Sequence, residues 1–189
     1  MKTFLSFEDL CHLQYKNQWE PSENTADSTA AAVIIPVRSR GPLSEILFIE
    51  KKEDPRYPWS GQIALPGGHW NQTDVGFENT ALRELEEETG IICDDVKIAG
   101  AVGAFHTIKK IIIHAYAGAI IRPVTIDFDK NEISRVLWVS VENLLYNHHG
   151  FEGRKPSLSE LIYPVPGNRI WGATARIVHT FLEAVRHIE

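Results

Sequence analysis

The sequence predicts a single domain of the α/β class, more closely α+β, in which helices cover the faces of a mixed β-sheet. Segments rich in β-branched residues alternate along the chain with segments of helical hydrophobic spacing, so both kinds of element are expected. Because no regular βαβ repeat occurs, we do not expect the strands to run all in parallel. With 189 residues, 43% of them hydrophobic, the chain can bury one sizeable core without disulfide bonds.

Local patterns place the elements in order along the chain. Strands are expected at residues 30–37, 46–52, 62–65, 96–102, 108–121 and 135–139. Helices are expected within residues 1–20, at Phe77–Thr89, at 141–146 and at 171–188. One-sided apolar spacing supports the first helix through Leu5, Leu10 and Leu13, and the last through Trp171, Val178, Phe181, Leu182 and Val185. We therefore expect a helix and linker at 1–28, followed by the main domain at 29–189.

Charge and cysteine content exclude several classes of protein. The chain has 19 Lys and Arg against 25 Asp and Glu, a formal net charge of −6, and no basic block that would suit a duplex nucleic-acid binder. Cys11 and Cys93 form neither a metal-type nor a redox pair, which suits a reducing compartment. No signal peptide is recognisable, and no stretch reaches the roughly 18 apolar residues of a membrane span. We expect a soluble cytoplasmic protein without a nucleic-acid or membrane partner.

The most informative segment is the acidic helix expected at Phe77–Thr89. A rotation of about 100° per residue places Glu84 and Glu88 about 20° on either side of the direction of Phe77. Glu87 lies about 80° away by the same count, so three carboxylates gather beside the apolar stripe of the helix. Like charges at this spacing destabilise a helix, and a bound divalent cation is a common compensation. The pattern predicts that Glu84, Glu87 and Glu88 are metal ligands.

The alternative is an acidic helix face that is merely solvated, and two neighbouring features favour the metal site. Arg83 precedes Glu87 by four residues, a spacing that lets the guanidinium hold this carboxylate in one orientation. A glycine pair, Gly67 and Gly68, is expected to form a turn that precedes the helix by about one helix length. Glu86 points to the opposite side of the helix, into solvent.

The nine residues Arg83-Glu84-Leu85-Glu86-Glu87-Glu88-Thr89-Gly90-Ile91 resemble the end of the Nudix box, the signature of the MutT-like Nudix hydrolases. The full pattern is G-x5-E-x7-R-E-U-x-E-E-x-G-U, where U is apolar, and its last nine positions all match. The front half departs from it. Counted back from the helix, the lone glutamate falls at Val75 and the first glycine at His69, whereas the chain has its glycine at Gly68. The loop is expected to be one residue longer and to lack the lone glutamate.

The resemblance implies an α/β/α sandwich with a mixed β-sheet and a Mg²⁺-dependent hydrolase, with Mn²⁺ as a substitute metal. Such enzymes cleave a diphosphate linked to another group, here in a small-molecule nucleotide substrate. The metal ligands implied are Glu84, Glu87, Glu88 and a backbone carbonyl near Gly68. The catalytic residues implied are Glu84, Arg83 and Glu87. Glu84 is the first candidate for the general base, and Glu132, which precedes the strand at 135–139, is the second.

A finer resemblance points to the subgroup of coenzyme A pyrophosphatases. Its GQVAFPGG motif resembles Gly61-Gln62-Ile63-Ala64-Leu65-Pro66-Gly67-Gly68, which is followed by Asp74, and its closing IWG motif resembles Ile170-Trp171-Gly172. Coenzyme A or a derivative is therefore the expected substrate. Alternatives are ADP-ribose, a dinucleotide or a nucleoside triphosphate. A non-catalytic domain that senses a nucleotide is the alternative of another class, although sensing relatives tend to lose the acidic trio.

The segment before the glycine pair is expected to contact substrate. Lys52 and Arg56 are the predicted phosphate-binding residues, with Lys51 beside them, and Lys52 stands where the subgroup has an arginine. The rest of the subgroup's upstream pattern is poorly matched, because Tyr57 replaces its second arginine and Trp59 its histidine. These two aromatic residues suit stacking on a nucleobase, with simple packing as the alternative. The sequence does not determine the oligomeric state, and a homodimer is one option.

Overall fold

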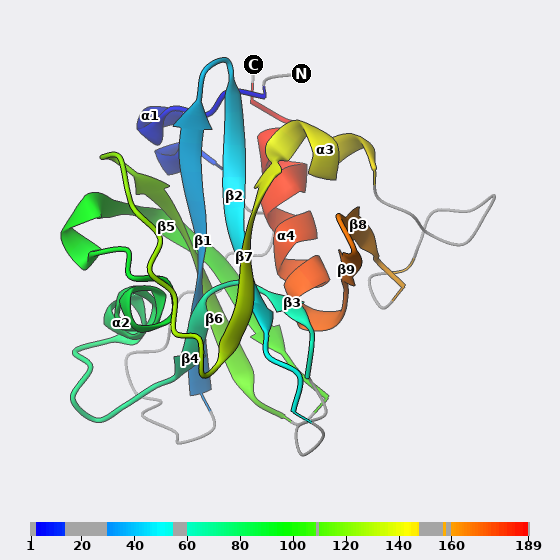
Figure 1. The fold of residues 1–189 in the computed structure, drawn as a ribbon. Coiled ribbons are helices and arrows are strands. Elements are labelled where there is room, and N and C mark those ends of the chain that lie inside the picture. The colour runs from blue at the N-terminus through cyan, green and yellow to red at the C-terminus, as the bar shows by residue number, and fades with distance from the viewer. Residues whose placement is uncertain are drawn as a thin grey trace.

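The structure is a computed structural model that describes residues 3–13, 30–54, 60–108, 110–147, 157 and 160–188. Its elements are α1 (Phe7–Cys11), β1 (Ala30–Arg40), β2 (Leu43–Lys51), β3 (Ile63–Ala64), β4 (Gly67–His69), α2 (Phe77–Thr89), a 3₁₀ turn (Cys93–Asp95), β5 (Val96–His106), β6 (Ile112–Ile120), β7 (Ile133–Ser140), α3 (Val141–Tyr146), β8 (Tyr163–Val165), β9 (Asn168–Ile170) and α4 (Gly172–Val185). Figure 1 shows them as helices packed around a twisted sheet.

Within the described residues, seven strands form one mixed sheet. Its main path is β3-β2-β1-β6-β5. Outside this path, β7 pairs with β2, and β4 pairs with the start of β1. β1 and β6 run parallel, whereas β1–β2, β2–β7 and β5–β6 are antiparallel. β8 and β9 form a separate hairpin. The mixed sheet expected from the missing βαβ repeat is confirmed.

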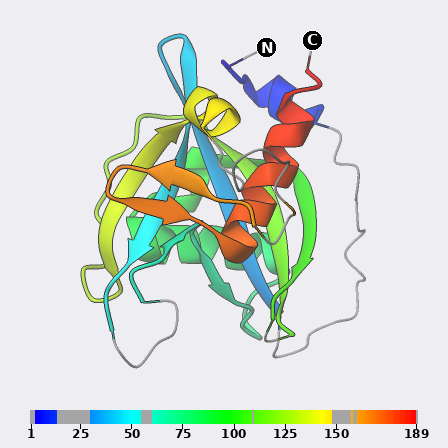
Figure 2. The same cartoon turned by 90° about the vertical axis from the view of Figure 1, so that its right-hand side faces the viewer.

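Helices cover both faces of this sheet, as Figures 1 and 2 show from two directions. One face packs against α4, α3 and the N-terminal segment in a core that includes Phe48, Phe181 and Leu182. The other face packs against α2 in a second core that includes Leu47 and Leu85. Alternate β2 residues point to opposite faces of a strand, so β2 contributes to both cores. The α/β/α sandwich is confirmed.

Several expected elements differ from those found. The N-terminal helix covers only Phe7–Cys11, where Ser6 and Asp9 form a reciprocal capping box, and the expected linker lies mostly outside the described residues. Within the part of the chain that the structure describes, no helix is long and apolar enough to cross a membrane. Trp171, expected on the apolar face of the last helix, lies before the first turn of α4 and is 45% exposed, so this expectation is wrong for Trp171. The strands β4, β8 and β9 were not expected.

Candidate active site

Helix α2 places its acidic residues against the short strand β4. Ala81 and Leu85 are fully buried under the sheet, and the helix contacts both β1 and β4 (Figure 1). It ends at Gly90, whose φ of 74° is the left-handed conformation expected of a glycine there. Because side chains one turn apart share a face, fixing Ala81 and Leu85 also fixes the row formed by Glu84 and Glu88. The apolar stripe thus determines which way the carboxylates point.

Glu88 is a buried carboxylate, with 4% of its surface exposed. Its Oε2 accepts a hydrogen bond from the backbone N–H of Gly67 at 3.0 Å, and its Oε1 forms an ion pair with the ammonium of Lys51. Burial raises the pKa of Glu88, while the charge of Lys51 and the two hydrogen bonds lower it and the charge of Glu84 raises it further. An ionised carboxylate at this depth needs such partners.

Glu84 approaches the neighbouring glycine. A Cβ added to Gly68 would lie 2.4 Å from Cδ of Glu84 and 2.5 Å from both of its carboxylate oxygens. Contacts this short do not occur between real atoms, so only glycine leaves room for the carboxylate here. Glu84 and Glu88 therefore flank the Gly67–Gly68 segment from one helix. The third member of the trio, Glu87, is more open, with 58% of its side chain exposed.

Arg83 holds two of these carboxylates. Its Nη1 donates to Oε1 of Glu84 and to Oε2 of Glu87, each at 2.8 Å. On its other side, Nε donates to Oδ1 of Asp74 at 3.0 Å and Nη2 to Oδ2 at 3.1 Å. The bond to Asp74 is the largest of the effects that raise the pKa of Arg83, so the guanidinium is permanently charged. One arginine thereby fixes the loop before α2 to the acidic row on α2.

Asp74 belongs to this cluster through its pair with Arg83, and the sequence interpretation gave it no role. The position predicted for a lone glutamate is Val75, which is 95% exposed and fills no such role. Asp74, one residue earlier, has a buried carboxylate that also accepts from the hydroxyl of Thr80 at 2.9 Å. Counting six residues forward from Gly68, instead of back from the helix, reaches Asp74. The extra residue of the loop therefore lies between Asp74 and α2, and an acidic residue is present after all.

Replacing Asp74 with Asn is expected to weaken the site and to remove part of its acid sensitivity. Hydrogen bonds to charged groups contribute roughly 1.5–3 kcal/mol, and Asn keeps only part of this pair, so we expect a loss of about 1–2 kcal/mol of unfolding free energy. Arg83 lowers the pKa of Asp74 below its ordinary value of 3.8. The stabilisation is therefore complete above pH 3.8 and is lost as the pH falls through the lower folded value.

Urea unfolding of both proteins from pH 7 down to pH 2 measures this difference. The gap in unfolding free energy between wild type and Asp74→Asn should be widest near neutral pH and shrink toward pH 2. Asp94→Asn is the control, because Asp94 is exposed and is not among the hydrogen-bond partners of Arg83. An equal gap at every pH would show that the Asp74–Arg83 pair does not supply the stability.

Of the remaining predicted residues, Lys52 and Glu132 lie where the end of β2 meets the loop before β7, and Arg56 lies outside the described residues. The ammonium of Lys52 donates to the carbonyl of Lys130 at 3.3 Å, and its backbone N–H donates to the carbonyl of Glu132 at 2.7 Å. This contact brings the loop before β7, with the exposed Glu132, close to the end of β2. Arg56, like the aromatic residues predicted to stack on a base, lies outside the described residues.

The donors around Gly67 and Gly68 fit a divalent cation. Carboxylate and carbonyl oxygens are the ligands that Mg²⁺ prefers, and the carboxylate of Glu84 fills the space that a side chain at position 68 would take. In the described residues, no three His, Cys, Asp or Glu side chains already surround one point. Their carboxylates are instead paired with Lys51 and Arg83. The oxygen ligands that a divalent ion would need are therefore present, and their carboxylates form ion pairs with Lys51 and Arg83.

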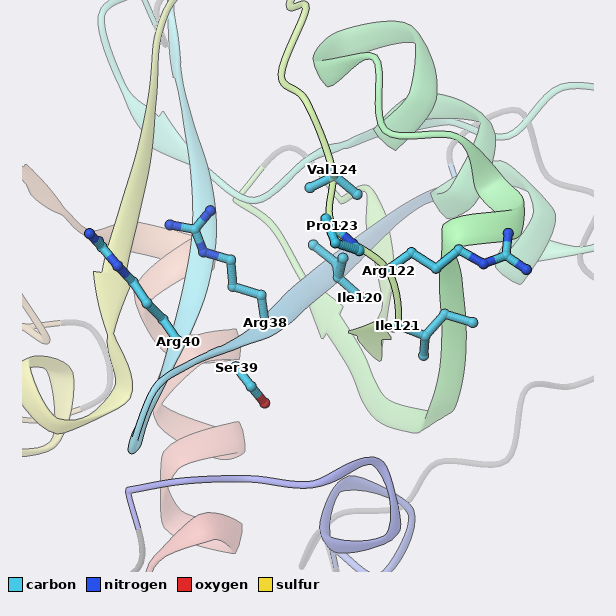
Figure 3. A pocket seen from close by; sticks show the side chains of 8 residues that line it. All are labelled: Arg38, Ser39, Arg40, Ile120, Ile121, Arg122, Pro123 and Val124. Carbon is cyan, nitrogen blue, oxygen red and sulfur yellow. The ribbon is translucent and has the colours of Figure 1, made fainter.

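A separate hollow of about 630 Å³ lies at the other end of β1. It is lined by Arg38, Ser39, Arg40, Ile120, Ile121, Arg122, Pro123 and Val124. In Figure 3, Arg38 and Arg40 point to one side and Arg122 to the other. Arg38 is bound to Glu45 and stacks on Trp138, and Arg122 pairs with Asp95. The side chains of these arginines do not point toward one common position. None of the predicted site residues lines this hollow.

The chain is similar to several known proteins. The sequence model of the NUDIX domain matches residues 27–161. The Nudix hydrolase NudL of Yersinia enterocolitica is 27% identical over 184 residues, covering 89% of this chain and 87% of that protein. A MutT/nudix family protein from Enterococcus faecalis has a TM-score of 0.58 at 15% identity, covering 89% of this chain and 66% of that chain. The NUDIX domain of Shewanella oneidensis NrtR, solved with ADP-ribose, has a TM-score of 0.55 at 15% identity, covering 88% and 94%.

The two solved structures establish a shared fold, and the domain match spans well over half of the chain, including the whole acidic helix. Members of this family generally depend on a divalent metal ion. The relative from Yersinia carries the name of a hydrolase and aligns along most of both chains. The chain therefore belongs to the Nudix family and is a pyrophosphohydrolase of that family.

Proposed function

We propose that the protein hydrolyses the diphosphate bond of a nucleoside diphosphate-linked small molecule with Mg²⁺ bound at the Gly67–Gly68 segment. The observation that carries the proposal is the convergence of Glu84 and Glu88 on this segment, where the first excludes a side chain from Gly68 and the second binds the N–H of Gly67. Glu87, held by Arg83, is the third ligand, and the carbonyl near Gly68 is the fourth. Mn²⁺ is expected to substitute for Mg²⁺.

Hydrolysis requires negative charge on the attacked phosphoryl group to be neutralised and a water molecule to lose its proton. Held by Glu84, Glu87 and Glu88, Mg²⁺ would supply this charge neutralisation. Arg83 keeps Glu84 and Glu87 in fixed orientations, so the ligands need little reorganisation. Glu84 is our first candidate for the base that takes the proton, and Glu132 the second, since its loop contacts the end of β2.

The proposed substrate is coenzyme A or a derivative. Its support is the segment from Gly61 to Gly68 and the Ile-Trp-Gly sequence before α4, both of which resemble coenzyme A pyrophosphatases. ADP-ribose is the second candidate, supported by the NrtR domain that was solved with this ligand. Lys52 and Arg56 are proposed to bind substrate phosphates. We further propose a cytoplasmic enzyme that acts on a free small molecule and has no nucleic-acid partner.

A substrate panel with product analysis tests the proposal. Purified protein is incubated with coenzyme A, ADP-ribose, a dinucleoside polyphosphate or a nucleoside triphosphate, with Mg²⁺ or with a chelator, and products are identified by mass spectrometry. We expect cleavage at the diphosphate of one of them, coenzyme A first, and none with the chelator. Cleavage that persists after metal removal would contradict the proposal. Tight binding without cleavage of any compound would favour the nucleotide-sensing alternative.

A further inference from the structure

Lys51 occupies an unusual position for a basic residue. It is the last residue of β2 and lies on the same face as Leu47 and Ile49, which pack in the core under α2. Its backbone N–H is fixed by the carbonyl of Gln62 at 2.9 Å. Its side chain is only 27% exposed, and its ammonium meets the buried carboxylate of Glu88. A strand thus directs a second cation, besides Arg83, toward the acidic residues of α2.

The carboxylates around this site outnumber the cations that pair with them. Among the described residues joined by these contacts, four carboxylates, Asp74, Glu84, Glu87 and Glu88, are met by two cations, Lys51 and Arg83. Two formal negative charges are left over, which is the complement of one divalent ion. Arg83 is bound on three sides by carboxylates and to the carbonyl of His69, so it is anchored. Lys51 has one carboxylate partner and a flexible stem.

We propose that Lys51 is a built-in counter-ion that neutralises Glu88 before metal binding and is displaced from it by the metal. The inference rests on the proposed function, because it takes Glu88 as a metal ligand. The ammonium of Lys51 and a metal ion would compete for the same carboxylate oxygen of Glu88. Bound side by side on this carboxylate, the two positive charges would also repel each other. The released ammonium would then be available to the negative charge of the substrate diphosphate. Lys51 would thereby couple metal binding to phosphate binding.

Metal affinity in the absence of substrate tests the displacement directly. Mn²⁺ binding is measured by electron paramagnetic resonance and calorimetry for wild type, Lys51→Met and Lys52→Met. Lys52 is the matched control, because it is the next residue, carries the same charge and has its ammonium on a backbone carbonyl. If Lys51 occupies Glu88 in most metal-free molecules, its removal should tighten Mn²⁺ binding about tenfold or more. Lys52→Met should change it less than about threefold, by loss of a more distant charge.

The outcomes separate this inference from the proposed function. Failure of wild-type protein to bind Mn²⁺ at millimolar concentration would overturn the proposed metal site and the inference with it. Normal binding to wild type with equal or weaker binding to Lys51→Met would overturn the inference alone. Where Lys51→Met folds poorly, Lys51→Gln serves as the second variant, since its amide can still donate to Glu88 but carries no charge. It is expected to tighten Mn²⁺ binding in the same direction, and an unchanged affinity would again overturn the inference.

Kinetics with the cleaved substrate test the second half of the coupling. Lys51→Met should raise KM for the diphosphate substrate several-fold at saturating metal, with a smaller change in kcat, because the ammonium contributes to binding the ground state as well as the transition state. Lys51→Arg, which keeps the charge, should retain a KM near that of wild type. An unchanged KM in Lys51→Met would show that the released ammonium does not reach the substrate.

Discussion

Glu87→Gln and Glu88→Gln are each expected to lower kcat at least roughly a hundredfold, a loss comparable to that of one electrostatic stabiliser. The contact with the metal strengthens as charge develops on the attacked phosphoryl group, so its loss affects the transition state more than substrate binding. Gln keeps the shape of the side chain. In Glu87→Gln its amide oxygen still accepts from Arg83, and the fold should be retained. Steady-state kinetics at saturating Mg²⁺ give kcat, and thermal unfolding checks the fold.

Glu86→Gln is the matched control on the same helix. Glu86 is exposed, faces away from Gly67 and Gly68, and accepts the backbone N–H of Cys93 at 3.0 Å. An amide oxygen can accept this bond as well, so kcat should stay within about twofold of wild type. If both Glu87→Gln and Glu88→Gln retained a kcat near that of wild type, these residues would not be metal ligands. A loss equal to theirs in Glu86→Gln would indicate a general effect of helix charge.

The acidic helix could be predicted from the sequence because its geometry is local. A repeat of 3.6 residues relates Ala81, Leu85 and Glu88 without knowledge of the rest of the fold, and Gly90 marks the end of the helix. The mixed sheet was also predictable, from the order of elements along the chain. The contact of Arg83 with Glu87 followed from the same four-residue spacing.

The partners of the helix could not be predicted, because they come from other elements. Lys51 and Glu88 are 37 residues apart in the sequence, and they meet because β2 and α2 contribute to the same core. Gly67 reaches Glu88 through a register in which Gly67 pairs with Val33 of β1, and the sequence does not encode that register in any countable pattern. β8 and β9 have three residues each, too few for a period of two to be visible. Asp74 was given no role because the motif was counted back from the helix, and the extra loop residue between Asp74 and α2 moved the expected acidic position to Val75.

Alanine substitutions at the two adjacent glycines, Gly67 and Gly68, should have different effects: the first should lower stability and the second should lower activity. Gly67 has a φ of 154°, and a Cβ there would lie 2.3 Å from the carbonyl oxygen of Ala32 and 2.6 Å from Cα of Val33. Both are backbone atoms of the paired strand β1, so relief requires β4 to separate from β1. Strain and overpacking of this kind cost about 3 kcal/mol or more. Gly67→Ala should therefore lower Tm by roughly 6–12 °C for a chain of this size.

Gly68→Ala should instead preserve the fold and impair catalysis. The atoms that its Cβ would strike belong to the carboxylate of Glu84, the end of a flexible side chain that can rotate away. Tm should change by less than about 3 °C, since no backbone pairing is disturbed. A ligand or base displaced by about 1 Å can cost on the order of a hundredfold in rate, so kcat should fall toward that level. Thermal unfolding and steady-state kinetics of both variants measure the contrast. A Gly68→Ala enzyme with wild-type kcat would show that Glu84 need not approach residue 68, and a Gly67→Ala protein with wild-type Tm would show that β4 does not pair with β1 as described.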